Sequence, residues 1–221
     1  MINIQKYEKE NQKISFITDM PISLANALRR SVLEIPTIAI DEVEISKNDS
    51  ALYDEILAHR VGLIPIKTGK IIKETKFRLK GIGPKTVYSG DITPSIELEA
   101  KLPIVILDAE QEIELVANAK LGIGEEHIKY SPGLIYYKHN IAPELLDFLD
   151  IDEEGRVNYE EKELKEKGLS EEQLTKIKKL SRINELVINI ESWGQIDVNK
   201  IFLESIDILS KNLTELDKAI K

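Results

Sequence analysis

The C-terminal end of the chain carries the pattern that most constrains the fold. Six large apolar residues follow one another at intervals of 4, 3, 4, 3 and 4, which places them on one stripe of a long helix beginning near Asp197. Burying each such side chain is worth about 1.5–3 kcal/mol, so leaving six in water would forgo on the order of 10 kcal/mol. The stripe must therefore be covered, by this chain's own sheet or by a partner. It consists of Phe202, Ile206, Leu209, Leu213, Leu216 and Ile220.

Composition narrows the class of protein. With 221 residues, 42% of them hydrophobic, the chain is long enough to bury a core in one domain or two. Its net charge of -9 repels phosphate, so sequence-independent binding to nucleic acid is disfavoured and proteins are the expected partners. The absence of cysteine excludes disulfides, thiolate metal sites and a cysteine nucleophile.

The first residues bear on where the protein works. Residues 1–11 alternate polar and apolar side chains without an uninterrupted hydrophobic run. We therefore expect neither a signal peptide nor a membrane-spanning helix. The expectation that follows is a soluble, cytoplasmic protein with no membrane contact.

The order of apolar patterns predicts an α+β fold. Alternation on either side of Glu10-Asn11 predicts an antiparallel hairpin, and a helix then begins near Pro21 and ends near Glu34. Pro36 favours that end, because proline disfavours helical geometry in the residue before it. We expect further strands at 37–45, 77–79, 96–98, 104–107, 113–117 and 186–190, and further helices at 53–61, 144–149 and 170–180.

Three blocks in the first third of the chain resemble one protein family. They run Asn26-Ala27-Leu28-Arg29-Arg30, then from Glu34 to Val43, then from Asp54 to Pro65. In this order and spacing they resemble the alpha-type subunits of cellular RNA polymerases, most closely the archaeal D subunit, which is itself similar to the third-largest subunit of eukaryotic RNA polymerase II. The similarity extends through 83–92, 122–132, Glu191-Ser192-Trp193-Gly194 and the terminal helix, leaving out only about 141–185.

The resemblance implies a domain organisation. Residues 1–44 and 186–221 would form a discontinuous dimerisation domain, and residues 45–140 would form a β-rich domain inserted into it. Residues 141–185 occupy the place where many archaeal D subunits carry a ferredoxin-like insertion with cysteine-bound iron–sulfur clusters. Because this chain has no cysteine, we expect a degenerate, cluster-free version there.

The resemblance also implies a function. It identifies the chain as a non-catalytic assembly subunit, which pairs with the small alpha-like subunit L and forms a platform for the second-largest polymerase subunit. The small subunits N and P are further partners by the same resemblance. No catalytic, cofactor or metal site and no sequence-specific DNA contact is expected in this chain. The terminal stripe by itself does not distinguish a homodimer from a heterodimer.

Interface residues follow from the same resemblance. The stripe of the terminal helix would face subunit L together with one face of the first helix, made of Leu24, Leu28 and Val32. The residues expected to face the second-largest subunit are Arg29, Arg30, Glu55, His59 and Arg60. We expect the segment that carries Glu55, His59 and Arg60 to be anchored by its apolar residues, which are Ile56, Leu57, Leu63 and Ile64. A solvated helix face is the alternative interpretation of the two adjacent arginines.

Residues 150–161 favour a competing function. Their acids at loop positions 1, 3 and 12 and the glycine at position 6 match a calcium-binding EF-hand loop. Position 5 is Glu154 rather than Asp or Asn, no apolar residue begins an exit helix, and no second loop is present to pair with it. A hairpin turn at Glu154-Gly155 is the competing structural interpretation. A calcium-responsive binding protein is thus the alternative function, and a free-standing enzyme is disfavoured because no nucleophile–base or metal constellation is apparent.

Overall fold

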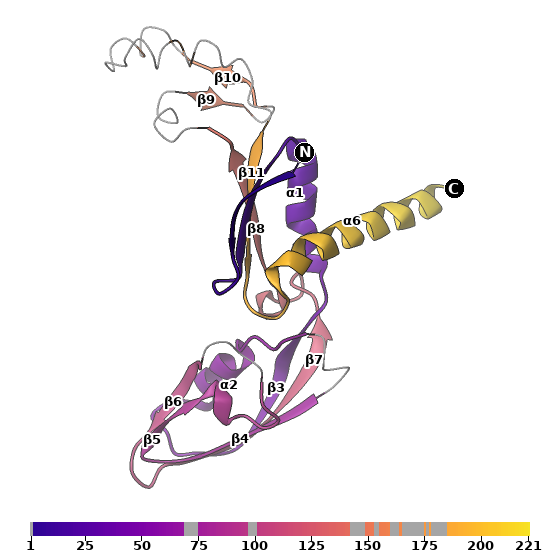
Figure 1. Cartoon of the computed structure of the whole chain (residues 1–221). Coiled ribbons are helices and arrows are strands. Elements are labelled where there is room, and N and C mark those ends of the chain that lie inside the picture. The colour runs from indigo at the N-terminus through magenta and orange to yellow at the C-terminus, as the bar shows by residue number, and fades with distance from the viewer. Residues whose placement is uncertain are drawn as a thin grey trace. The chain divides into compact units, whose positions relative to one another are not determined.

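A computed structural model describes residues 2–68, 75–96, 101–141, 149–152, 155–159 and 185–221, with the single positions 164, 175 and 177. The chain divides into two compact units (Figure 1). Unit 1 comprises Met1–Arg29 and Ile135–Ile190, and unit 2 comprises Arg30–Leu134 and Glu191–Lys221. Strands dominate the described residues and are accompanied by helices, so the predicted α+β class is confirmed in this coarse form.

The sheet of unit 1 joins the first and last segments of the chain. Its four strands are β1 (Ile2–Glu8), β2 (Lys13–Thr18), β11 (Leu186–Ser192) and β8 (Gly133–His139), in the order β1-β2-β11-β8. The predicted hairpin is confirmed, since β1 and β2 pair antiparallel with Ile4 opposite Phe16. The neighbouring positions of β2 and β11 bring residues far apart in sequence side by side.

The first helix begins and ends as the sequence predicts. Helix α1 spans Ile22–Ser31, and the 3-10 turn η1 follows it at Val32–Glu34. Ile35, the residue before Pro36, is extended with φ −67° and ψ 120°, which is the conformation that a following proline favours. Ala25 and Leu28 are buried and the two arginines of the helix are exposed, whereas Leu24 of the predicted apolar face is exposed as well.

Unit 2 is built on a three-stranded antiparallel sheet in the order β3-β7-β4. These strands are β3 (Thr37–Asn48), β7 (Glu112–Gly122) and β4 (Thr75–Ile82). A second pair joins β5 (Lys85–Tyr88) to β6 (Pro103–Leu107). The helical elements of unit 2 are α2 (Asp54–Gly62), α6 (Val198–Ile220), η1 and the short turns η2 (Ser89–Asp91) and η3 (Ile128–Tyr130).

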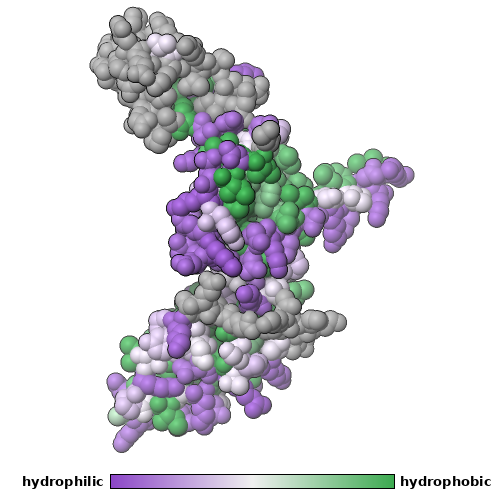
Figure 2. Space-filling view, in the orientation of Figure 1, coloured by the Kyte–Doolittle hydropathy of each residue, from purple (hydrophilic) through white to green (hydrophobic). Residues whose placement is uncertain are grey.

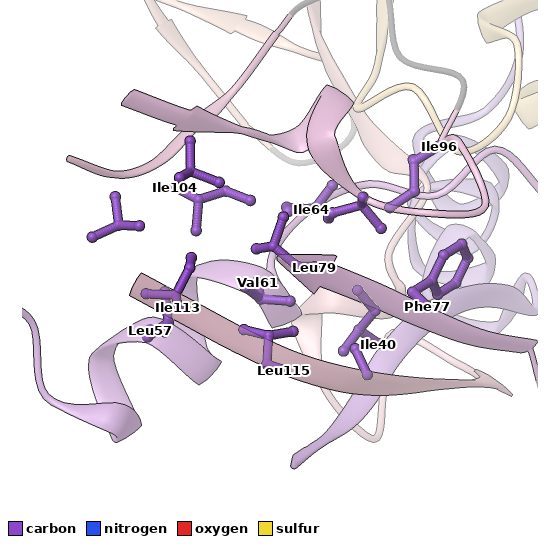
Figure 3. Close-up of a cluster of buried hydrophobic side chains, with 14 of the residues drawn as sticks. Ile40, Leu57, Val61, Ile64, Phe77, Leu79, Ile96, Ile104, Ile113 and Leu115 are labelled. Atoms are coloured by element: carbon purple, nitrogen blue, oxygen red, sulfur yellow. The ribbon is translucent and has the colours of Figure 1, made fainter. Parts of the chain in front are cut away.

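The core of unit 2 lies between this sheet and α2 (Figure 3). Alternation along β4 and β7 turns Phe77, Leu79, Ile113 and Leu115 inward, each at most 2% exposed. Helix α2 contributes Leu57 and Val61, both fully buried. The predicted strands 37–45, 77–79, 104–107 and 113–117 are confirmed. Of the predicted strand 96–98, Ile96 is buried and the other two positions lie outside the described residues.

A charged cluster fixes η3 to the sheet. Asp41 on β3 accepts hydrogen bonds from Lys129 Nζ at 2.8 Å and from the Tyr130 hydroxyl at 3.1 Å, and it pairs with Lys120 Nζ at 2.8 Å. The lysines, Lys120 foremost, hold the pKa of Asp41 well below its usual range. Tyr130 packs so closely over Gly122 that an added Cβ would lie 2.7 Å from its ring, so glycine is required there.

The segment expected to be a degenerate insertion forms a small antiparallel pair. Strands β9 (Asp150–Ile151) and β10 (Val157–Asn158) are hydrogen-bonded to each other. Leu164 and Ile177 are buried nearby, with Ile141, Leu149 and Tyr159 packed against them. The predicted helices at 144–149 and 170–180 lie largely outside the described residues, and Thr175 and Ile177 are helical within the second. Among the described residues, no helix is long and apolar enough to cross a membrane.

Candidate protein-interaction surfaces

Helix α6 consists of a packed half and a projecting half. It begins after Asp197, and its first turns bury Val198, Ile201 and Ser205 at 0–1% exposure. Asn212 Nδ2 then donates to Glu34 Oε2 at 2.7 Å, which ties the middle of the helix to η1. Every residue in 210–221 is exposed. The last three turns of α6 therefore extend beyond the packing of their own unit.

The predicted apolar stripe lies on one side of α6. Phe202 and Leu209 are partly buried, while four members of the stripe are 39–76% exposed, namely Ile206, Leu213, Leu216 and Ile220. Figure 2 shows hydrophobic residues along one edge of the projecting half and hydrophilic residues along the other. Leu203, 61% exposed, lies off the stripe and was not predicted as a surface residue.

The projecting half is the end of a 23-residue helix, so the packed turns supply its nucleus and its own residues add little further stability. A separate helix as short as this half would be marginal in water. The ion pairs along its polar side, Lys211 with Glu215 at 3.9 Å and Lys221 with Asp217 at 2.6 Å, add only about 0.2–0.5 kcal/mol each. Covering the apolar side is the remaining large source of stability for this part of the helix.

The residues predicted on α1 divide into buried and exposed ones. Leu28 and Val32 are at most 4% exposed and fill the core of the chain itself, whereas Leu24 is 41% exposed. Leu24 is thus the member of this group that the chain leaves accessible. Contact of Leu24, Leu28 and Val32 with a partner stays a prediction. Leu24 is the residue most directly able to make that contact.

The adjacent arginines of α1 both face water. Arg29 donates from Nε and Nη2 to Asn26 Oδ1 at 3.1 and 2.9 Å, a contact within the helix. Among the described residues neither Arg29 nor Arg30 has an acidic partner within ion-pair distance. Their positive charge is therefore accessible to a partner. Contact of the two arginines with the second-largest subunit stays a prediction, and the solvated-face alternative has the same appearance.

Helix α2 exposes a second mixed surface. Glu55, His59 and Arg60 are all exposed, and Arg60 Nη2 donates to the Pro103 carbonyl at 2.9 Å. The predicted anchors divide, because Leu57 and Ile64 are buried but Ile56 and Leu63 are 48% and 46% exposed. The expectation that Ile56 and Leu63 anchor the α2 segment in the core is wrong. A nine-residue helix against one sheet buries a single face, and Ile56 and Leu63 point away from it.

Tyr53 adds to this outward face and was missed by the sequence analysis. It precedes the helix and is 80% exposed. Tyr53, Ile56 and Leu63 are spaced by 3 and 7 residues, which places them on one side of α2 next to the charged residues. The signal was present in this spacing, since a short helix with apolar residues on two faces cannot bury both against one sheet.

The sequence matches a family model described as the RNA polymerase Rpb3/Rpb11 dimerisation domain over residues 16–213. The chain belongs to this family. The resemblance inferred from the sequence is thereby confirmed. The matched region runs from β2 into the projecting half of α6 and so includes both α1 and Leu209.

Individual relatives agree with the family match. Proteins named DNA-directed RNA polymerase subunit Rpo3 are 42% identical over 154 residues in Pyrococcus furiosus, 41% over 169 in Methanocaldococcus jannaschii and 30% over 219 in Natronomonas pharaonis. These alignments cover 62%, 73% and 90% of this chain and 59%, 87% and 89% of the relatives. The alignment thus spans about three-fifths of the length of the Pyrococcus protein.

The calcium-loop alternative receives no support from the described part of 150–161. Asp152 Oδ1 accepts a hydrogen bond from Arg156 N at 2.8 Å, and Gly155 N donates to the Asp152 carbonyl at 2.9 Å. These bonds close a turn between β9 and β10, as in the hairpin interpretation. The part of the chain that the structure describes contains no group of three His, Asp or Glu side chains placed to hold a metal.

Proposed function

We propose that this chain is a non-catalytic assembly subunit of an archaeal-type DNA-directed RNA polymerase. It forms a heterodimer with an L-type partner through α6 and then supports the second-largest subunit. The observation that carries the proposal is the projecting half of α6, which exposes an apolar stripe in a member of a polymerase dimerisation family.

The energetics of the stripe favour a protein partner. Leu213, Leu216 and Ile220 are each more than half exposed. Burying them against a second apolar helix would be worth about 1.5–3 kcal/mol for each side chain. The same contact would order the last turns of α6, which their own propensity supports weakly. Dimerisation therefore supplies both the binding energy and the stability of this helix.

A different chain is a better partner than a second copy. The family description pairs two named components, Rpb3 and Rpb11, in one dimerisation domain. An L-type subunit would take the position of the second component. Leu24 on α1 adds an exposed apolar group that such a partner would cover.

We extend the proposal to the domains. Residues 1–44 and 186–221 form the discontinuous dimerisation domain, and the adjacency of β2 and β11 supports this assignment. Residues 45–140 form the inserted β-rich domain, supported by the core around α2, most of whose residues fall in this range. Residues 141–185 form a degenerate ferredoxin-like segment without a cluster. The small apolar group around Leu164 and Ile177 supplies packing there in place of metal ligation.

The second-largest subunit would contact the outward face of α2 and the arginines of α1. Exposed charge at Glu55, His59 and Arg60 supports this, together with the apolar Ile56 and Leu63 between them. Such a mixture of apolar centre and charged surroundings is typical of subunit interfaces. Small subunits of the N and P type would join the same assembly, in which catalysis belongs to other chains.

A pair of charged substitutions in the stripe tests the dimer. Leu209→Asp combined with Leu213→Asp should abolish co-purification with the L-type partner, because two unpaired carboxylates would be buried at the contact. Lys211→Gln combined with Lys218→Gln is the matched control. It changes the net charge by the same -2 on the side of α6 opposite the stripe and should leave pairing intact.

The wild-type chain provides the opposite test. Without its partner it should self-associate as its concentration rises, because the stripe stays exposed. A wild-type chain that stays a folded, soluble monomer and ignores an L-type subunit would overturn the proposed function.

A further inference from the structure

A cavity of about 220 Å³ opens beside the outward face of α2, within unit 2. Its apolar wall is formed by Ile40 and Val43 of β3 and by Ala58 and Leu63 at α2. Ile40 is 1% exposed, whereas Leu63 is 46% exposed. The cavity thus runs from the edge of the core to the surface. Leu63 belongs both to the cavity wall and to the outward face described above.

The polar part of the lining contains one ion pair, Asp41 with Lys129, and the imidazoles of His59 and His127. Asp41 and Lys129 are paired at 2.8 Å, so neither needs a ligand. His127 Nδ1 accepts a hydrogen bond from Lys129 N at 3.1 Å. With Nδ1 accepting, the ring carries its hydrogen on Nε2, which is a donor. Among the described residues neither this nitrogen nor the exposed His59 ring has a further hydrogen-bond partner, so the cavity offers hydrogen bonds beside an apolar wall.

Size and chemistry together indicate the kind of occupant. Clefts that bind small molecules usually measure about 300–1,000 Å³, so this cavity is below that range. Protein interfaces, by contrast, are commonly anchored by one aromatic side chain seated in a pocket. Tyrosine and tryptophan combine a large apolar ring with one polar atom that needs a partner when buried. The lining of this cavity matches that combination.

We propose that the cavity receives a single tyrosine or tryptophan side chain of the second-largest polymerase subunit. The inference rests on the proposed function, because it names the anchor of the contact that α2 would make. The continuity of the cavity with the outward face of α2, through His59 and Leu63, places the anchor within that contact.

Gly62 at the end of α2 keeps the cavity open. It lines the cavity, and a Cβ added there would meet only the Ile40 carbonyl oxygen at 3.7 Å, an ordinary van der Waals distance. Its φ lies outside the left-handed region. The fold therefore has room for a side chain at this position, and the missing side chain leaves space that an incoming ring would fill.

The experiment fills the cavity with a side chain introduced at Gly62. Gly62→Leu, in the full chain paired with its L-type partner, should weaken binding of the second-largest subunit by about tenfold or more, because the leucine occupies the anchor's place. Gly90→Leu is the matched control. An added Cβ at Gly90 meets nothing within 4 Å, and its φ is also outside the left-handed region, so this variant should bind normally. Both variants should keep the L-type partner and the melting temperature of the wild type.

Gly62→Ala guards against misfolding of the larger variant. Its methyl group fits at ordinary contact distance, so the variant folds and should weaken binding by a smaller factor than leucine. Normal binding by Gly62→Leu, or an equal loss in Gly90→Leu, overturns the inference. If Gly62→Leu fails to fold, normal binding by Gly62→Ala overturns it instead. A wild-type heterodimer that does not bind the large subunit at all refutes the proposed contact itself, which separates the two failures.

Discussion

Helices α2 and α6 both carry large apolar residues, but those residues have opposite surroundings. In α2 the apolar residues Leu57 and Val61 are completely buried in the core of unit 2. In the projecting half of α6, Leu213 and Leu216 are 58% and 55% exposed. Branched apolar residues about one helical turn apart thus stabilise the fold in one place and remain in water in the other.

The difference teaches how a subunit separates folding from assembly. The buried face of α2 contributes its hydrophobic free energy when the chain folds, whether or not a partner is present. The exposed part of the α6 stripe, from Leu213 to Ile220, would contribute its hydrophobic free energy when a second chain covers it. Folding stability and pairing affinity should therefore respond to different substitutions, and this separation can be tested directly.

The largest expected effect on folding comes from a truncation in α2. Leu57→Ala should lower the free energy of unfolding by about 2–5 kcal/mol, because it removes a buried side chain and leaves a cavity. Leu213→Ala, the equivalent change in the exposed stripe, should alter the unfolding free energy of the isolated chain by no more than about 0.5 kcal/mol. Urea unfolding of both variants measures the contrast, and equal losses would remove it.

A smaller effect on stability is expected from removing the charge of Asp41, which binds η3 to the sheet of unit 2. Asp41→Asn should lower the free energy of unfolding by about 1–2 kcal/mol, because Lys129 and Tyr130 lose a charged acceptor. Asp217→Asn on α6 is the control. Its ion pair with Lys221 is exposed, with both side chains more than 60% accessible, so its loss should be close to the limit of measurement.

The pH dependence of the Asp41 contribution has a definite sign. Its pKa is lowered in the folded chain from an ordinary value of 3.8, chiefly by Lys120 and then Lys129. The stabilisation is therefore fully present above that ordinary value and is lost as pH falls below it towards the folded pKa. The stability difference between wild type and Asp41→Asn should be constant from neutral pH down to about 4 and shrink below that. A difference that grows on acidification contradicts the assignment.

Local patterns predicted much of the fold because they report local chemistry. The end of α1 followed from Pro36, and β7 followed from the alternation of Ile113, Leu115 and Ala117. Strand β8 was missed, because Leu134 and Tyr136 on its exposed side are large and mostly apolar, like the buried Ile135, and so hide the alternation. The predicted strand at 96–98 lies largely outside the described residues.

The candidate surfaces were predictable to a lesser extent. Periodicity located the stripe of α6, but a helix covered by its own chain and one left for a partner show the same spacing. Burial of Leu28 and exposure of Ile56 depend on contacts with residues distant in sequence, which no local pattern records. The cavity beside Gly62 was invisible for the same reason, because His127 is distant from α2 in the sequence and is isolated there.

The smallest expected effect on folding comes from charged residues outside the apolar faces of α2 and α6. Changing them sharpens the comparison of folding with assembly, because pairing with the L-type subunit should stay intact. Arg29→Glu combined with Arg60→Glu changes two exposed residues, of which Arg60 loses one hydrogen bond to the Pro103 carbonyl, so stability should fall by about 0–1 kcal/mol. The double variant should still pair with an L-type subunit through α6 but fail to recruit the second-largest subunit, because like charge at a polar junction opposes docking.

Lys138→Glu combined with Lys76→Glu is the control. It makes the same change in net charge, again with one exposed site in each unit, and should assemble normally. Reconstitution followed by size-exclusion chromatography distinguishes the cases. Complete assembly by the arginine variant, or loss of its L-type partner, would show that these charges do not act at a separate large-subunit contact.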